Sequence, residues 1–277
     1  MADQLDSFWA LQNGDGTDPT FGTKIALLQH FSNNQFKSVD AAYYSELPDL
    51  SNGTHTFDDG HLYFIKTAST GSGKIELHRL SDNADYKLKF DLHTGSVFAA
   101  GEAVNGTFHV NGGDLHFIKT RNTGSGVVEV HSAKGTDSWA YHGSTPFTLD
   151  DASNGQFIVR NKDIYFIKTR NTTSGKVELY ISHQATKYKD KVQNVTVLTP
   201  DAKDKLWHVD GKGNLYRLQA PGEYSNEKMA VQIAFSGQKK YAIYWTYPLT
   251  WTGYDFAKFP GWMFGLPAAG EEGTLPQ

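Results

Sequence analysis

Three segments of the chain share one pattern of hydrophobic and polar positions. Residues 62–67, 115–120 and 164–169 each read as an apolar residue, an aromatic or histidine, and then Phe-Ile-Lys-Thr. A second segment follows each copy, with the alternation seen in Val-Val-Glu-Val-His at 127–131. Alternation with a period of two, in residues rich in aromatic and β-branched types, predicts β-strands and disfavours helices.

The shared phrase recurs at a nearly constant spacing. Its phenylalanine stands at positions 64, 117 and 166, so the copies are 53 and 49 residues apart. A period near 50 residues, with several strands in each copy, is typical of β-propellers and related repeat arrays.

Each full copy predicts four short strands. First strands are expected at 54–57, 107–110, 156–159 and 205–209, each followed by a polar turn and then by the shared phrase or its weaker fourth version at 215–218. A loop leads into the third strand. An aromatic residue is then expected to open the fourth strand, and each copy ends at a small polar turn such as Asn-Gly. The three aromatic residues in this position are Tyr86, Trp139 and Tyr188.

The two chain ends predict one further unit between them. Residues 8–12, 23–27 and Phe36 correspond to the second, third and fourth strands of a copy that lacks its first strand, and residues 252–264 read as an extra first strand with a turn. A strand from one end that completes the sheet at the other end removes free sheet edges. We therefore predict an all-β chain that forms a β-propeller of five four-stranded blades closed by a C-terminal strand. Six blades are the alternative.

This prediction treats residues 1–277 as one domain. The expected repeats are about 1–51, 52–104, 105–153, 154–203 and 204–250, with 251–277 as closing strand and tail.

Composition limits the classes of partner and cofactor. The net charge is −4 and no basic block occurs, so a nucleic acid or an anionic membrane is not expected as the main ligand. The chain has no cysteine, which excludes disulfides, thiol catalysis and cysteine-bound zinc. No signal peptide is visible and no apolar stretch of membrane-spanning length occurs, so we expect a cytoplasmic protein without membrane insertion, with release by a non-classical route left open.

The sequence carries no recognisable catalytic or cofactor motif. Zinc-protease, phosphate-loop, dinucleotide and nucleophile-elbow patterns are absent, so we expect no cofactor, no metal and no catalysis. The alternative is a propeller enzyme that acts on glycans or small metabolites at an axial channel. Its site would be built from first-strand residues such as His55, His109 and Asp210. A protein-interaction scaffold is a third hypothesis.

A lysine and a glutamate stand ten residues apart in each strong copy. Two interpretations remain open, a repeated polar pocket or a structural ion pair across two antiparallel strands. The three pairs are Lys66 with Glu76, Lys119 with Glu129, and Lys168 with Glu178.

The loops and the recurring aromatics are candidate ligand-binding residues. Arg121 and Asn122 recur as Arg170 and Asn171, and such side chains offer paired donors and an acceptor to hydroxyl-rich or carboxylate ligands. Aromatic rings stack on the apolar face of a sugar, or else pack in the core. The aromatic candidates are Tyr86, Trp139, Tyr188 and Trp207.

The repeat resembles that of the β-propeller lectins of fungi and invertebrates, such as the tachylectin-2-like and Psathyrella velutina lectin-like groups. The resemblance covers roughly residues 6–264 and is carried by segments such as 117–126 and 128–131. It implies a multivalent carbohydrate-binding protein without catalytic activity, with a role in defence. Shallow sites would lie between blades or in their loops, glycans or glycoconjugates would be the partners, and assembly into oligomers is compatible with it.

Overall fold

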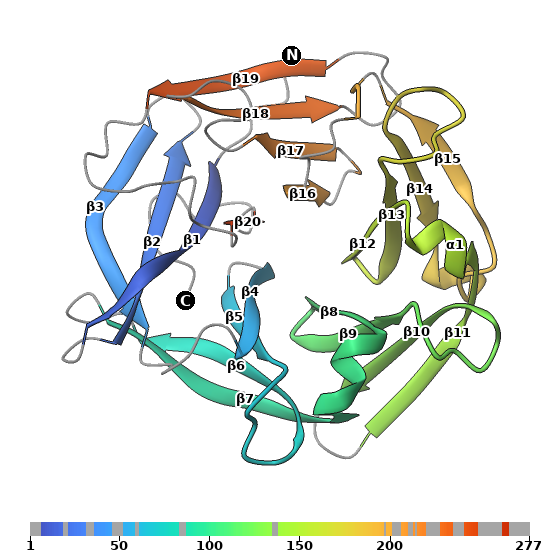
Figure 1. Ribbon diagram of the computed structural model, residues 1–277, viewed down its shortest axis with the longest axis horizontal. Coiled ribbons are helices and arrows are strands. Elements are labelled where there is room, and N and C mark those ends of the chain that lie inside the picture. Colours follow the sequence, from blue (N-terminus) through green and yellow to red (C-terminus); the bar gives the residue numbers. More distant parts are fainter. Residues whose placement is uncertain are drawn as a thin grey trace.

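A computed structural model gives the fold of the chain. It describes residues 7–18, 22–31, 36–45, 52–58, 61–82, 87–134, 138–196, 198–200, 206–209, 213, 215–219, 228–234, 241–248 and 262–265. For 7–45 and 228–265 the backbone alone is described. The described residues form an all-β structure of antiparallel sheets (Figure 1). None of the helices in this part of the chain has the length and apolar character needed to cross a bilayer.

The strong copies fold as four-stranded antiparallel units, as the pattern predicted. The first contains β4 (Gly53–Asp58), β5 (His61–Lys66), β6 (Lys74–Asp82) and β7 (Lys87–Ala99). The second contains β8 (Gly106–Asn111), β9 (Asp114–Lys119), β10 (Val127–Lys134) and β11 (Ser138–Thr148). The third contains β12 (Gly155–Arg160), β13 (Asp163–Lys168), β14 (Glu178–Ser182) and β15 (Val192–Val195).

Short helices connect these units. They are η3 (Ala100–Asn105) and α1 (Leu149–Ala152), and a further short helix, η4 (Gln184–Thr186), lies within the third unit between β14 and β15.

The weaker copies form strands as well. The fourth-copy sheet contains β16 (Leu206–Val209), β17 (Leu215–Gln219), β18 (Lys228–Ala234) and β19 (Tyr241–Pro248). Near the N-terminus lie β1 (Ser7–Asp18), β2 (Gly22–Phe31) and β3 (Phe36–Ser45). A short parallel pairing of β3 with β7 joins them to the β4–β7 unit in one eight-stranded sheet.

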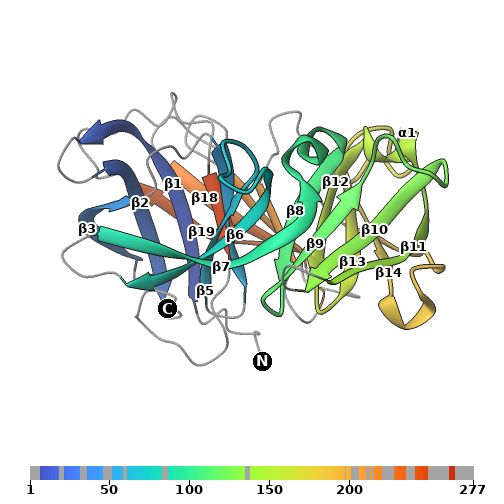
Figure 2. The same cartoon turned by 90° about the horizontal axis from the view of Figure 1, so that it is seen from below.

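The two chain ends pair with each other. Strand β20 (Trp262–Gly265) runs antiparallel to β1, from Trp9 opposite Gly265 to Gln12 opposite Trp262. The strands nearest the centre of the molecule also contact one another in turn, β4 with β8, β8 with β12, and β12 with β16, while β20 contacts both β16 and β4 (Figures 1 and 2).

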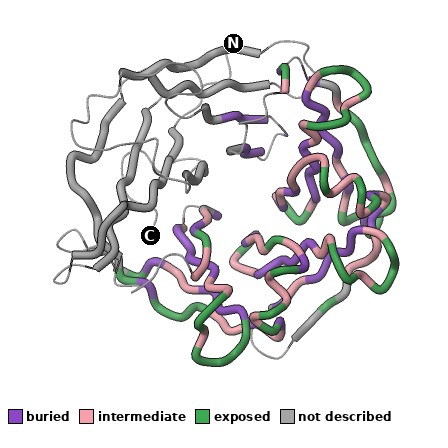
Figure 3. Tube along the Cα trace, viewed as in Figure 1, coloured by how far each residue is buried: buried purple, intermediate pink, exposed green. Residues whose placement is uncertain are grey.

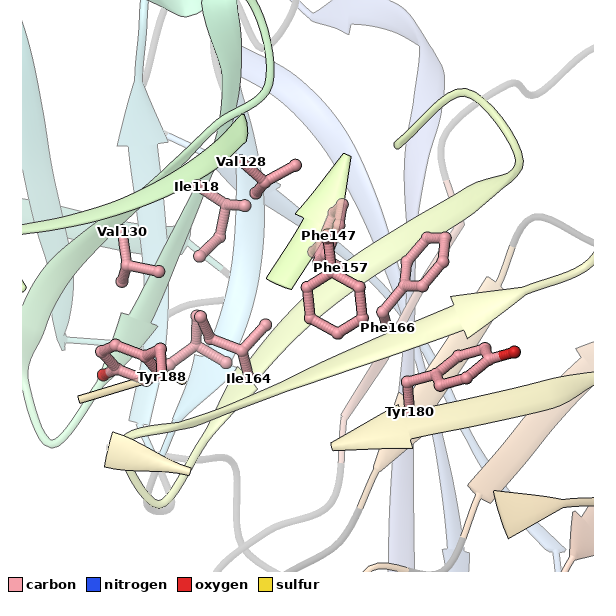
Figure 4. Close-up of a cluster of buried hydrophobic side chains, with 10 residues drawn as sticks. Ile118, Val128, Val130, Phe147, Phe157, Ile164, Phe166, Tyr180 and Tyr188 are labelled. Atoms are coloured by element: carbon pink, nitrogen blue, oxygen red, sulfur yellow. The ribbon is translucent and has the colours of Figure 1, made fainter. Parts of the chain in front are cut away.

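Each strong unit packs against its neighbours through apolar side chains. One cluster joins Ile118, Val128 and Val130 of the second unit to residues of the third, including Phe157 and Phe166 (Figure 4). Similar clusters lie at the junctions on either side. Each central sheet is therefore covered on both faces by its neighbouring sheets, which explains why four consecutive residues are buried in β5, β9 and β13 (Figure 3).

The Asn-Gly pairs do more than turn the chain. The Asn105 carbonyl oxygen accepts the backbone N–H groups of Thr120 and Arg121, at 2.8 and 2.9 Å. Gly106 follows and pairs with Lys119. A Cβ at Gly106 would lie 2.0 Å from the carbonyl oxygen of Ile118, and the glycines at 53 and 155 meet the same obstacle. This close approach of two backbones requires glycine.

One predicted strand start is wrong. Tyr188 does not open a fourth strand, because β15 begins at Val192. Tyr188 instead lies just after η4 with a φ of 58°, and its backbone N–H donates to the His183 carbonyl oxygen at 2.9 Å. This turn uses the residues that form the first part of the fourth strand in the other copies. Trp139 lies within β11 opposite Ala133, and Tyr86 lies outside the described residues.

We expect Gly106→Ala to lower the free energy of unfolding by more than about 2 kcal/mol, because the added methyl group meets backbone rather than a movable side chain. Urea denaturation measures this. Gly101→Ala is the matched control, since a Cβ there meets no atom within 4 Å, and its effect should stay within about 0.5 kcal/mol. Equal effects of the two substitutions would contradict the close-approach argument.

Candidate functional site

A hollow of about 440 Å³ lies at the junction between the β4–β7 and β8–β11 units. Its volume falls in the range of small-molecule sites. Seven residues line it: Val97, Phe98, Ala99, Glu102, Phe117, Lys119 and His131. The first three end β7, Glu102 belongs to η3, and the others come from β9 and β10. Two neighbouring repeats therefore contribute to one site.

Buried hydroxyl groups position the ring of Phe98. The backbone N–H of Phe98 donates to Ser96 Oγ at 3.2 Å. At the next junction Phe147 N–H donates to Thr145 Oγ1 at 3.3 Å, and Thr145 Oγ1 donates to the Val128 carbonyl oxygen at 2.9 Å. A serine or threonine two residues before the ring thus fixes the last residues of the fourth strand.

The polar side of the hollow is a linked network. Lys119 Nζ lies 3.2 Å from Glu102 Oε2, which also accepts Asn105 Nδ2 at 3.2 Å. Asn122 Nδ2 in turn donates to Asn105 Oδ1 at 2.7 Å. The predicted ligand residue Asn122 thus connects to the hollow through Asn105, as a positioning residue.

The predicted opposition of lysine and glutamate across the hairpin is confirmed. Lys119 lies opposite Glu129, and the pairs at 66/76 and 168/178 have the same register. The ion pair of Lys119, however, is with Glu102. Glu129 is buried and accepts the Ser125 backbone N–H at 2.8 Å, and its Oε2 lies 3.1 Å from His131 Nε2.

This arrangement keeps Glu129 ionised. Burial alone would raise its pKa, but hydrogen bonds from Ser125 and His131 outweigh burial, so the pKa lies below its usual value. Burial lowers the pKa of His131, although Glu129 acts in the opposite direction. The imidazole of His131, the ammonium group of Lys119 and the carboxylate of Glu102 therefore line the hollow, and the buried Glu129 carboxylate lies behind His131.

The rings of Phe98, Phe117 and His131, together with Glu102 and Lys119, form an arrangement that we call the frame. The same frame recurs at the next junction, 49 residues further along the chain. The ring centroids of Phe98 and Phe117 are 5.3 Å apart, as are those of Phe147 and Phe166. The remaining ring distances also agree: 6.4 Å from Phe98 to His131 against 6.3 Å from Phe147 to Tyr180, and 5.9 Å from Phe117 to His131 against 6.0 Å from Phe166 to Tyr180. Asp151 stands in place of Glu102 and Lys168 in place of Lys119.

The frame is not universal. At the junction before β16–β19, Leu198 and Arg217 hold the positions of the two phenylalanines, and Arg217 donates to the Thr199 carbonyl oxygen at 2.9 Å. At the junction before β4–β7, Phe64 and His78 are present with Lys66, but the other half lies outside the described residues.

The other predicted ligand residues lie elsewhere. Arg121 Nη1 donates to the Val104 carbonyl oxygen at 3.3 Å, and Arg170 donates to the Ser153 carbonyl oxygen. Asn171 Nδ2 donates to Asn154 Oδ1 at 2.9 Å. All three side chains are exposed, and Asn122 and Asn171 both have a φ of 50°, so their residue type also serves the turn.

Two of the predicted stacking rings are in the core. Tyr188 is 1% exposed and donates its hydroxyl to the Lys162 carbonyl oxygen at 2.7 Å. Trp207 is buried beneath Arg217, whose guanidinium lies 5.6 Å from the ring. Trp139 and Tyr86 have no described side chain, and their role as stacking rings stays a prediction.

The sequence reasoning missed Phe98 and Glu102. A signal for both exists, because a phenylalanine and an acidic residue stand seven and three positions before Asn105 and again before Asn154.

The central alternative site is less suited to catalysis. Burial lowers the pKa of His55 to about 3, and burial with His116 nearby lowers that of His109 to about 4. Imidazoles with such values are weak bases near neutral pH. Asp58 is the last residue of β4. Its carboxylate accepts the Gly113 backbone N–H at 3.1 Å and lies 3.7 Å from Arg160 Nη1. Asp210 lies outside the described residues, and within the described part no cluster of three or more potential metal ligands occurs.

No protein-family model matches the chain, and no curated protein matches it. Solved structures similar to it include the Bacteroides ovatus xyloglucan PUL GH43B, at 13% identity and a TM-score of 0.40 over 69% of this chain and 40% of that one. The polysaccharide lyase Uly1 has 13% identity and a TM-score of 0.34 over 82% of this chain and 61% of its own. A subtype N11 neuraminidase-like protein of a flat-faced bat isolate has 12% identity and a TM-score of 0.34, over 72% of this chain and 73% of its own.

This chain therefore spans less than two thirds of the length of the first two structures.

We expect His55→Phe to flatten the acid limb of the stability curve. Between pH 6.5 and about 3 the unfolded chain protonates this histidine while the folded chain does not, so the free energy of unfolding falls as the pH falls through that window. Phenylalanine occupies the equivalent positions 108 and 157, so the variant should fold. Denaturant titrations between pH 4 and 7 measure the slope.

Val104→Ala is the control, since it changes an exposed residue without a titratable group and should leave this slope unchanged. A slope that is the same in His55→Phe and in the parent would show that His55 protonates freely in the folded state.

Proposed function

We propose that the chain binds carbohydrate, at hollows between neighbouring sheets, and performs no chemistry on it. The observation that carries this is the ring and charge frame around Phe98, repeated around Phe147 with ring distances that agree within about 0.1 Å. Phe98 and Phe117 line the hollow with little of each ring exposed, 6% and 1%, so they offer a sugar an apolar wall, and the neighbouring ammonium and carboxylate groups suit its polar substituents.

We also infer that the sheets form a five-bladed propeller closed through β20. The antiparallel order β20-β1-β2-β3 supports this, because it supplies a fifth four-stranded group beside those of the other copies. The contacts of β20 with β16 and β4 support it as well. In such a ring the resemblance to propeller lectins becomes a testable expectation: a count of more than one weak site per chain would raise avidity for a glycan-coated surface by about 10²–10⁴.

We expect Phe98→Leu to remove one binding site per chain in calorimetric titrations with the best ligand from a glycan array. Phe98 forms part of the wall of the hollow, and leucine removes the ring contact and changes the shape of this wall. Loss of about 1.4 kcal/mol weakens a site tenfold, below detection for a weak ligand. Leu198 holds the equivalent position at another junction, so the fold tolerates this residue.

The exposed Val104→Ala is the control, and it should keep every site. A chain that binds no glycan on the array, or an unchanged number of sites in Phe98→Leu, would refute binding at this hollow.

We expect Lys119→Ala to have the same effect on this site, because it removes the ammonium group that holds Glu102 across the hollow. The matched control is Lys74→Ala, since Lys74 is exposed and does not line the hollow. Calorimetry under identical salt conditions compares the two. Equal binding by both variants would show that Lys119 has no part in recognition.

A further inference from the structure

A lysine of the chain itself lies on the second copy of the frame. Lys191 Nζ is 5.0 Å from the ring centroid of Phe147 and 4.8 Å from that of Tyr180. It also lies 3.5 Å from Asp151 Oδ2. Phe147, Tyr180 and Asp151 are the counterparts of Phe98, His131 and Glu102. At this junction, therefore, the ammonium group of Lys191 lies against the rings of Phe147 and Tyr180 and the carboxylate of Asp151, whose counterparts line the hollow at the first junction.

The chemistry of this contact is specific for a cation. The faces of aromatic rings attract a positive charge within about 6 Å, and an adjacent carboxylate adds to that attraction. The carboxylate is held in place, because Asp151 and Thr148 form a reciprocal cap of α1, with Asp151 N–H donating to Thr148 Oγ1 at 3.0 Å. The contact is therefore a built arrangement of groups around the amine.

The first junction has no lysine at this position. In the β14–β15 pair Val192 lies opposite Ile181, and in the β10–β11 pair Ala140 lies opposite Ser132, the counterpart of Ile181. The preceding residues, Lys191 and Trp139, therefore hold equivalent backbone positions. The charged side chains at the two junctions differ accordingly. Glu102 and Glu129 stand against Lys119 at the first, whereas Asp151 and Glu178 stand against Lys168 and Lys191 at the second.

Among the side chains that the structure describes, the first junction thus has one positive charge fewer than the second. His131 does not supply it, since burial disfavours its protonation. Arg121 and Arg170 occupy equivalent loop positions and donate to equivalent carbonyl groups, so they leave the difference unchanged.

We propose that the hollow lined by Phe98, Glu102 and His131 takes a protonated amine, as carried by an amino sugar, and that Lys191 fills the same place at the second junction. This rests on the proposed carbohydrate binding and names its ligand class. The chain's own lysine is the observed neighbour of these groups at the second junction, and the hollow at the first junction has two phenylalanine rings, an imidazole and the Glu102 carboxylate to hold an amine.

Calorimetry at pH 6 with glucosamine and with N-acetylglucosamine tests the ligand class, because the two sugars share a ring and differ in the charge at one nitrogen. We expect glucosamine to bind the parent chain about tenfold more tightly, from the cation–ring and carboxylate contacts together. We expect Phe98→Leu to abolish this preference. Equal affinities, or a preference for the acetylated sugar, would overturn the proposal while leaving carbohydrate binding intact. Binding of neither sugar nor any array glycan would instead refute the proposed function.

Lys191→Ala tests the second half of the proposal. Removing the internal amine should open the second frame, so the number of glucosamine sites per chain rises by one. Lys191→Arg is the matched control and should keep the parent number, because the guanidinium also stacks on rings and pairs with Asp151. An unchanged number of sites in Lys191→Ala, in a variant whose unfolding curve matches the parent, would overturn the assignment.

Discussion

Burial of each central sheet on both faces is the constraint on which the rest of the structure depends. A strand such as β9 has a neighbouring sheet on either side, so four consecutive residues of its phrase are buried, and three of the four are apolar. A polar group within this layer must find its partners nearby. Glu129 does so through Ser125 and His131, which explains why the loop after β9 and the last residue of the shared third-strand pattern recur together with the glutamate.

The same constraint explains why the hollows lie where they do. Apolar contact fills the space between sheets along the strands, but the chain leaves the fourth strand through a short helix and turns toward the next first strand at Asn105. At this point rings from two sheets meet with the lysine that ends β9. Hydrogen bonds from Asn105 and Asn122 hold the acidic side chain of the helix, so the polar side is fixed by the turn.

The repeat period and the strands of the strong copies could be predicted from the sequence, because the phrase has few structural interpretations. The pairing of a C-terminal strand with β1 also followed from the missing first strand near the N-terminus, but the strand that pairs is 262–265, where the sequence predicted a turn, and the predicted strand before it lies outside the described residues. The site was harder to find. Phe98 and Glu102 belong to one repeat, and Lys119 and His131 belong to the next, so reading one repeat at a time separates them. The sequence predicted Tyr188 as an accessible ring for a ligand, but the residue is buried. Its burial depends on a turn that replaces the start of a strand.

That division of the site between repeats has an evolutionary consequence. Gene duplication copies whole repeats, and each added repeat brings the second half of one site and the first half of another. A repeat excised alone would carry no complete hollow, whereas two in tandem would carry one. Selection can therefore act on each junction separately. A single codon change at position 191 is enough to close or open the second junction to a ligand, without altering the rings and the carboxylate that Lys191 contacts.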